Sequence, residues 1–265
     1  MIKKLSTLLF ILTVLTAAIG RAQDKTAFDK GLYAEKGDTL KYRILFPVQF
    51  DPNTKYPLII VLHGAGERGN NNEAQLAYGT NLFLSQEVRQ QYQAIVVYPQ
   101  CPADSYWSNV DIQKDSLSGK RKFYFQEAKA EPTKAMKALM GLTQELLDKP
   151  YVNKKQVYIG GLSMGGMGTY EMLRRKTKVF AAAFAICGGD NTLNAKIYAK
   201  KVPLWIFHGA KDNVVPVDHS EVMVAAIREA GGDPRYTVYP KALHDSWTQA
   251  FAEPDLLPWL FSHKK

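Results

Sequence analysis

The sequence has few of the residues that bind metals or cross-link a fold. It contains two cysteines and five histidines in 265 residues. No His-Glu-x-x-His pair, paired cysteine motif or cluster of carboxylates at ligand spacing is present, so the common metal-site patterns are missing. The glycine-rich loops contain neither Gly-Lys-Ser/Thr nor a Gly-x-Gly-x-x-Gly before a helix, which argues against a phosphate-bearing cofactor. We therefore expect neither a metal nor a cofactor.

Long apolar runs are also missing, apart from one near the amino terminus. Leu5 to Ile19 is a mostly apolar stretch of fifteen residues, shorter than the ~20 that a membrane-spanning helix needs. Lys3-Lys4 precedes it and Gly20-Arg21-Ala22 follows it, which completes the pattern of a secretory signal peptide. We expect residues 1–22 to be removed and the protein to be secreted or periplasmic, with no membrane span after cleavage.

A concentrated block of charge is absent as well. The formal net charge of +9 falls to +6 when Lys3, Lys4 and Arg21 leave with the signal peptide. The remaining lysines are scattered except at the carboxyl end, and no nucleic-acid-binding motif accompanies them. This distribution favours a solvated surface and no nucleic-acid partner.

The two cysteines predict free thiols rather than a disulfide. Two thiols can pair in an oxidising compartment. Cys101 and Cys187, however, each follow a predicted strand, and we expect these strands in different parts of the sheet. We therefore expect two separate buried thiols. Cα atoms of Cys101 and Cys187 within ~7 Å of one another would instead indicate a disulfide.

Strand and helix patterns alternate along residues 23–265, a length that suits one large domain. A hairpin at residues 31–46 is expected at the sheet edge. Further strands are predicted at 58–62, 94–98, 157–159, 180–186, 203–207 and 236–239, with helices at 131–147 and 220–229 between them. The prediction is an α/β fold with a mostly parallel sheet of about eight strands and helices on both faces. Functional residues of such sheets collect at the carboxyl ends of the strands.

One segment, at about residues 101–129, is too long for a simple connection. It holds several aromatic residues among polar ones and begins at a carboxyl strand end. Two interpretations stay open: a surface excursion whose aromatics pack on the body, or a wall or flap over the active-site mouth.

The strongest chemical signal is Gly161-Leu162-Ser163-Met164-Gly165. A β-branched run precedes it and a helical pattern follows it, so Ser163 is expected at a sharp strand-to-helix turn. Glycines two residues either side of the serine allow strand and helix to close on that turn. The pattern is typical of the nucleophile elbow of a serine hydrolase.

An activated serine needs a base and an acid that orients the base. Of the five histidines, His63 and His208 precede glycines at strand ends, where we expect them to brace loops. His244 lies in the loop after the last strand, at the end where the elbow points. In α/β-hydrolases the acid falls between serine and histidine, which selects Asp212, with Asp190 as the runner-up.

Two backbone amides are expected to stabilise the tetrahedral oxyanion. The amide of Met164 follows the nucleophile, and Ala65 in the glycine-rich loop after residues 58–62 supplies the second, with Gly64 as the alternative. Glu67 and Arg68 are predicted to pair and hold that loop.

These pieces resemble the α/β-hydrolase superfamily, and within it the secreted esterases related to polyhydroxybutyrate depolymerases, feruloyl esterases and phospholipase/carboxylesterases. The matching segments run in the family's order: 62–69, 98–102, 161–166, 207–216 and 244–247. The resemblance implies hydrolysis of carboxylic esters through an acyl-enzyme, with Ser163 as nucleophile, His244 as base and then acid, and Asp212 as orienter. It also implies that the Ala65 and Met164 amides bind the oxyanion.

The substrate is less constrained by the sequence. Trp107 in the excursion and Trp247 beside the base are predicted to line a pocket for an aromatic or sugar ester, such as feruloylated or acetylated xylan. The expected partner is therefore a small-molecule or polysaccharide-linked ester. A prolyl-oligopeptidase-like serine peptidase and a non-catalytic binding protein of the same fold are the alternatives.

Overall fold

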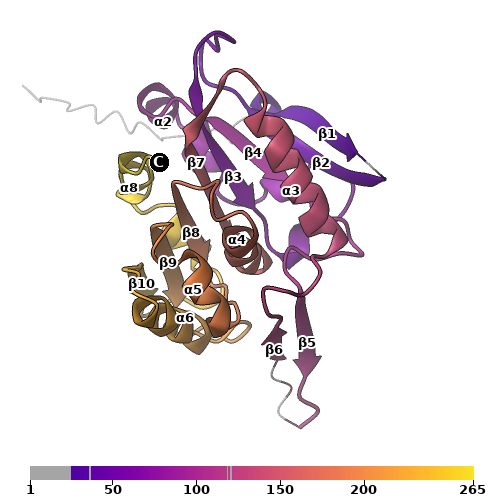
Figure 1. Ribbon diagram of the computed structural model, residues 1–265, viewed down its shortest axis with the longest axis vertical. Coiled ribbons are helices and arrows are strands. Elements are labelled where there is room, and N and C mark those ends of the chain that lie inside the picture. The colour runs from indigo at the N-terminus through magenta and orange to yellow at the C-terminus, as the bar shows by residue number, and fades with distance from the viewer. Residues whose placement is uncertain (1–24, 36, 118, 120) are drawn as a thin grey trace, which may run out of the picture.

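The computed structural model describes residues 25–35, 37–117, 119 and 121–265 (Figure 1). The predicted signal peptide, residues 1–22, lies outside the described residues. A central sheet has the strand order β1-β2-β4-β3-β7-β8-β9-β10, which confirms the predicted eight-stranded, mostly parallel α/β sheet. Its strands are β1 Asp29–Glu35, β2 Asp38–Leu45, β3 Tyr56–Leu62, β4 Ile95–Pro99, β7 Val152–Leu162, β8 Ala182–Ile186, β9 Leu204–Gly209 and β10 Arg235–Tyr239.

The antiparallel part of the sheet is confined to one edge. β1 and β2 pair from Asp29 opposite Ile44 to Glu35 opposite Asp38, so the predicted edge hairpin is confirmed. β2 is also antiparallel to β4, whereas the pairs from β4 through β10 are parallel. The carboxyl ends of these parallel strands therefore meet at one side of the molecule.

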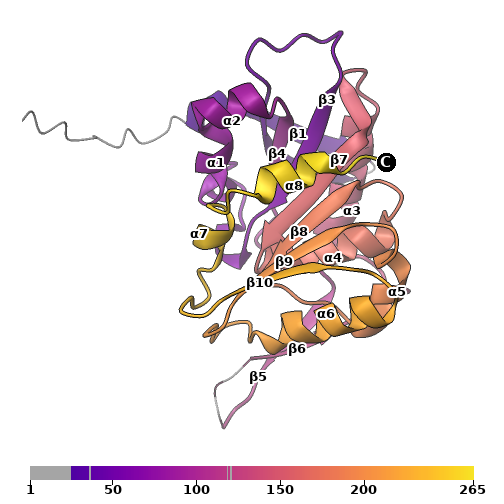
Figure 2. The same cartoon turned by 90° about the vertical axis from the view of Figure 1, so that its left-hand side faces the viewer.

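Helices cover both faces of the sheet (Figure 2). One face carries α3 Lys134–Leu147, α4 Met164–Arg175, α5 Ala195–Tyr198 and α6 Asp218–Glu229; the other carries α1 Thr80–Leu84, α2 Gln86–Gln91, α7 Trp247–Ala250 and α8 Leu256–Ser262. In β3, Leu58 and Ile60 pack toward the first layer and Ile59 and Val61 toward the second. A strand buried on both faces reads as a continuous apolar run, as this one does.

Helix α3 shows how the sequence sets an element boundary. Its buried side chains include the predicted face of Ala135, Leu139, Leu142 and Leu146. It begins at Lys134 rather than at Glu131, because the Thr133 hydroxyl accepts a 3.1 Å hydrogen bond from the Met136 amide and acts as the N-cap.

Residues 101–129 form an excursion that ends in a two-stranded hairpin, β5 Val110–Lys114 and β6 Arg121–Phe125. The hairpin projects from the body (Figure 1). Charged side chains of α4 hold both of its ends: Glu171 accepts from the Asn109 amide at 2.7 Å, and Arg174 donates to the Gln126 carbonyl at 2.6 Å. The Glu171 and Arg174 side chains are almost fully buried, so the base of the hairpin is fixed to the helix that follows Ser163.

Both cysteines are free and buried, Cys101 after β4 and Cys187 after β8, which confirms the two separate thiols. Burial raises the pKa of the Cys101 thiol to about 12. No helix in the described part of the chain is both long and apolar enough to span a bilayer.

Candidate active site

A tight turn between β7 and α4 presents Ser163 at the carboxyl side of the sheet. Ser163 has φ 54° and ψ −117°, a conformation that non-glycine residues adopt rarely. A Cβ atom on Gly161 would lie 2.6 Å from the Leu62 carbonyl oxygen, and one on Gly165 would collide with the same oxygen. The strand, turn and helix therefore close as the glycine spacing predicts.

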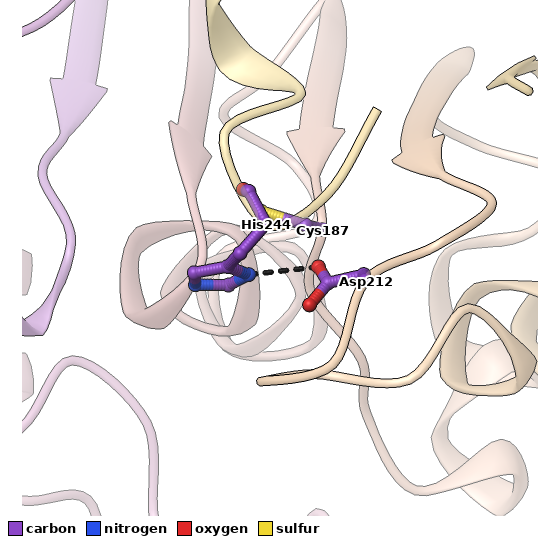
Figure 3. Close-up of side chains that lie close together, drawn as sticks. All are labelled: Cys187, Asp212 and His244. Atoms are coloured by element: carbon purple, nitrogen blue, oxygen red, sulfur yellow. Dashed lines mark hydrogen bonds and ion pairs between the residues drawn. The ribbon is translucent and has the colours of Figure 1, made fainter. Parts of the chain in front are cut away.

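His244 lies between Ser163 and Asp212. Its Nε2 is 3.0 Å from Ser163 Oγ and its Nδ1 is 2.7 Å from Asp212 Oδ2. An ionised carboxylate only accepts hydrogen bonds, so Nδ1–H donates to Asp212 and Nε2 is left to accept the Ser163 hydroxyl proton. Figure 3 shows the His244 ring directed at the Asp212 carboxylate. The three residues predicted from chain order are thus brought together, and we call them the triad.

Asp212 is held as an anion by its surroundings. Oδ1 accepts from the amides of Val214 and Val215 at 2.9 and 3.0 Å. Burial alone would raise its pKa, but hydrogen bonds from His208 and His244 outweigh burial and hold the pKa well below its usual range. The carboxylate is therefore ionised at neutral pH and fixed in orientation.

His208 braces this loop, as predicted, and also contacts the acid itself. Its Nε2 donates to the Val215 carbonyl at 2.9 Å and lies 3.3 Å from Asp212 Oδ2, while Nδ1 is 2.7 Å from Ser220 Oγ. The contact with Asp212 was not predicted. The four-residue spacing in His208-Gly-Ala-Lys-Asp212 after a buried strand is the signal that could have indicated it.

The runner-up acid, Asp190, lies elsewhere. It is buried beside Arg174, 3.8 Å away, and accepts from Asn194 at 3.0 Å. Burial raises its pKa to about 7, with Arg174 opposing the shift. It forms no hydrogen bond to His244 in the described structure, so the structure favours Asp212.

His63 is a neutral brace, also as predicted. Its Nε2 accepts from the Cys101 amide at 2.9 Å, and Nδ1 donates to the Gly64 carbonyl at 2.6 Å. Burial lowers its pKa to about 4. The ring therefore ties the loop after β3 to the loop after β4 without charge.

Two backbone amides beside Ser163 have no acceptor among the described residues. Met164 is the first residue of α4, and Ala65 opens the short 3-10 helix at Ala65–Glu67. The alternative donor, the Gly64 amide, is directed at the Glu67 carboxylate. This arrangement favours the predicted Ala65 and Met164 pair as the oxyanion-binding amides.

The predicted Glu67–Arg68 ion pair is wrong, since these two side chains form none in the described structure. Arg68 instead donates to the Ala65 carbonyl and, at 3.1 Å, to the Ser105 carbonyl, and its guanidinium lies over the Tyr106 ring. Arg68 thus holds the loop, as expected, but does so through carbonyl oxygens. Glu67 faces the pocket, and burial raises the pKa of its carboxyl.

The triad opens into a pocket of about 290 Å³, which we call the catalytic pocket. Trp247 lines it, as predicted, with its ring 5.2 Å from the His244 ring. Four further residues line the pocket: Tyr78, Tyr106, Arg121 and Phe123. The last three belong to the excursion, for which a wall was one of the two predicted interpretations, whereas Tyr78 comes from a separate loop before α1 and was not predicted.

The prediction for Trp107 is wrong. Its side chain is fully buried and packs edge-on against His63 at 5.4 Å, outside the pocket lining. Gly168 of α4 makes room for it, since a Cβ there would lie 2.5 Å from the Trp107 Cβ. Trp107 therefore supports the site from the core.

The excursion combines both open interpretations. Trp107 packs into the body, whereas Arg121 and Phe123 of β6 form part of the catalytic pocket wall. His219 of α6 packs edge-on against Phe123 and Phe125 at 5.2 and 5.8 Å, which holds the strand at the pocket.

Cys187 completes a close group with Asp212 and His244 (Figure 3), in which the potential ligand atoms lie within 4.8 Å of one another. A metal would need the thiolate, but burial raises the pKa of the Cys187 thiol far above its ordinary value. The other two groups are already hydrogen-bonded to each other. These residues therefore fit a triad and do not fit a metal site.

A larger hollow of about 1000 Å³ lies at the opposite, amino ends of β8 to β10. Several basic residues line it, including Lys200, Lys201 and Arg235, but none of the triad does. The predicted catalytic residues Ser163 and His244 therefore line the smaller pocket and not this hollow.

Comparisons with known proteins agree with this geometry. A bifunctional acetylxylan esterase/xylanase from Neocallimastix patriciarum is 26% identical over 195 residues, which is 74% of this chain and 25% of that protein. The structure of a thermostable esterase is 32% identical, with a TM-score of 0.79, over 91% of this chain and 64% of that one. The chain thus spans about a quarter of the curated relative and less than two thirds of the esterase.

A ferulic acid esterase structure shares the fold, with a TM-score of 0.64 and 18% identity over 88% of this chain and 97% of that one. The family of phospholipases and carboxylesterases matches residues 47–254, a range that includes the whole triad, both candidate oxyanion amides and the wall of the catalytic pocket. The chain belongs to the phospholipase/carboxylesterase family of the α/β-hydrolase superfamily.

Proposed function

We propose that this protein is an exported serine esterase that hydrolyses acetyl or feruloyl esters carried by xylan-type polysaccharides. The observation that carries the proposal is the hydrogen-bonded line from Ser163 Oγ through His244 to Asp212, at 3.0 and 2.7 Å, at the base of a pocket. The acetylxylan esterase and ferulic acid esterase relatives support the substrate class. Export is supported by the pattern of residues 1–22 alone.

In the acylation step, Ser163 Oγ attacks the ester carbonyl carbon while His244 Nε2 takes the hydroxyl proton. The negative oxygen of the tetrahedral intermediate faces the Ala65 and Met164 amides, each worth about 3 to 4 kcal/mol of transition-state stabilisation. The intermediate collapses with cleavage of the carbon–oxygen bond, and the leaving alkoxide takes the proton from His244.

Deacylation repeats these steps with water. His244 takes a proton from the water molecule, whose oxygen attacks the acyl carbon, and the second intermediate expels Ser163. Ser163 recovers the proton from His244, and the carboxylic acid is released. Asp212 stays ionised throughout and stabilises the imidazolium that forms in each half of the cycle.

The pocket wall supports the proposed acyl groups. Tyr78, Tyr106, Phe123 and Trp247 surround a space of about 290 Å³. Of these, Tyr106 and Phe123 provide large apolar surface for a planar phenolic acid or a short acyl group. Arg121 and Glu67 supply charged groups at the same wall.

The test is labelling and turnover of Ser163→Ala. The wild-type protein should react with a fluorophosphonate probe at Ser163, and the variant should lose the label and at least about 10³-fold of its kcat on p-nitrophenyl acetate. Ser262→Ala, at an exposed serine of α8, is the matched control and should keep both. Full activity in Ser163→Ala would refute the serine mechanism.

A screen of acetyl, long-chain acyl, feruloyl and acetyl-sugar esters tests the substrate class. Preference for acetyl-sugar or feruloyl esters supports it, and preference for long-chain esters contradicts it. Faster turnover of aminoacyl amides than of esters would favour the peptidase alternative instead.

A further inference from the structure

A second hollow adjoins the catalytic pocket on the side of the base. It has a volume of about 260 Å³ and is lined by residues 77–82 and by Trp247, Thr248, Phe251 and Ala252. Tyr78 and Trp247 line both this hollow and the catalytic pocket. The two cavities therefore share one pair of aromatic rings as a common wall.

We propose that this hollow is a subsite for a pyranose ring of the leaving-group side of the substrate, with Tyr78 and Trp247 as its aromatic platform. The inference rests on the proposed esterase function and deepens it. We call the hollow the sugar subsite.

The position of His244 assigns the subsite to the alcohol part of the ester. His244 Nε2 must protonate the leaving oxygen, so that oxygen lies within hydrogen-bond distance of the ring. Trp247 is the residue whose ring packs edge-on against His244, at 5.2 Å and 85°. A leaving alcohol larger than the catalytic pocket would therefore extend past Trp247 toward the sugar subsite.

The chemistry of the walls suits a sugar. The Tyr78 and Trp247 rings lie 5.2 Å apart, tilted by 49°, and Tyr78 is 40% exposed. Exposed aromatic faces bury the apolar carbon–hydrogen face of a pyranose while hydroxyls stay at the rim. The Asn81 amide and the Thr248 hydroxyl supply exposed donors and acceptors at that rim.

An apolar alkyl chain fits these observations less well. The lining includes the polar residues Thr80, Asn81 and Thr248 among the aromatic, aliphatic and small ones. A mixed lining with a few polar groups recognises a polar ligand in a fixed orientation. A long acyl chain would also have to lie on the leaving-group side of His244, where the acyl group does not belong.

The experiment compares an acetylated xylotetraose with p-nitrophenyl acetate, which has no sugar in its leaving group. The ratio of kcat/KM for the first substrate to that for the second should fall about tenfold in Tyr78→Ala, mainly through KM. Tyr78→Phe keeps the ring and should restore the ratio to within about twofold of wild type. Tyr124→Ala, at an exposed tyrosine outside both cavities, is the matched control and should leave the ratio unchanged.

A binding measurement separates recognition from turnover. Calorimetry of Ser163→Ala with unacetylated xylotetraose should detect binding, and adding Tyr78→Ala should weaken it by about tenfold. If wild type hydrolyses esters but the ratio and the binding are the same in Tyr78→Ala, the sugar subsite is refuted and the esterase proposal stands. If Tyr78→Ala selectively impairs long-chain p-nitrophenyl esters, the hollow binds an acyl chain and the inference is wrong. Absence of ester hydrolysis in the wild type is the distinct outcome that removes the proposed function.

Discussion

Replacing Asp212 by asparagine keeps the shape of the side chain and removes its charge. The asparagine oxygen can still accept from the Val214 and Val215 amides, which lie 2.9 and 3.0 Å from Oδ1. Its NH2 group, however, then faces His208 Nε2, which already donates to the Val215 carbonyl. The NH2 group and the His208 Nε2–H are then two donors that face each other. The His208 ring cannot turn away without losing its hydrogen bond to the Val215 carbonyl.

Two quantities should change as a result. Because His244 Nδ1–H loses its acceptor, the ring adopts the wrong tautomer and kcat should fall by about 10⁴-fold. The lost charged hydrogen bonds, at about 1.5 to 3 kcal/mol each, should lower the free energy of unfolding by about 2 to 4 kcal/mol at pH 7, after allowing for relaxation.

The stability loss should depend on pH in one direction. The pKa of Asp212 is lower in the folded than in the unfolded protein, so its stabilisation is present above the unfolded value of about 3.9 and lost as the pH falls through the folded one. Guanidinium unfolding at pH 7 and pH 3, with p-nitrophenyl acetate turnover at pH 7, measures both effects. A kcat within about tenfold of wild type, or a stability difference equal at the two pH values, would refute this account of Asp212.

Three further predictions concern other parts of the chain. Burial raises the pKa of Asp190 to about 7, so the wild-type protein loses stability as the pH rises from the unfolded pKa to that value. The free energy of unfolding of Asp190→Asn, relative to that of the wild type, should therefore increase from pH 4 to pH 8. A decrease of this difference in denaturant unfolding would contradict the prediction. Gly165→Ala places a Cβ against the Leu62 carbonyl and should lower the free energy of unfolding by more than about 3 kcal/mol in thermal or denaturant unfolding. The control is Gly66→Ala, whose Cβ would have no atom within 4 Å; it should change the free energy of unfolding by less than about 0.5 kcal/mol. Expression of the whole chain in an exporting bacterial host should give a protein that begins at Gln23 by mass spectrometry, and a purified protein that still begins at Met1 would argue against the signal peptide.

The sheet was predictable because its signals are local. Continuous apolar runs such as residues 58–62 indicate strands buried on both faces, and the glycine turn at residues 36–38 indicates the edge hairpin. Two local features selected Ser163, Asp212 and His244: the chain order serine, acid, histidine, and the position of each residue after a strand. The second feature is informative because the carboxyl ends of parallel strands meet at one side of the sheet. The two glycines around Ser163 determine the turn because no Cβ fits beside the Leu62 carbonyl.

The pocket wall was decided only by the tertiary structure. Tyr78 and Tyr106 lie in two different loops and Phe123 in strand β6, and all three line the catalytic pocket. No local sequence pattern encodes such long-range packing. Trp107 and Trp247 were both predicted to line the pocket, yet Trp107 is buried in the core, where Gly168 leaves room for its side chain. The sequence alone determined the sheet, the turn and the order of the triad, because these depend on local periodicity and on steric limits near each residue. The walls that select a substrate depend on contacts between distant segments, so only the folded chain determines them.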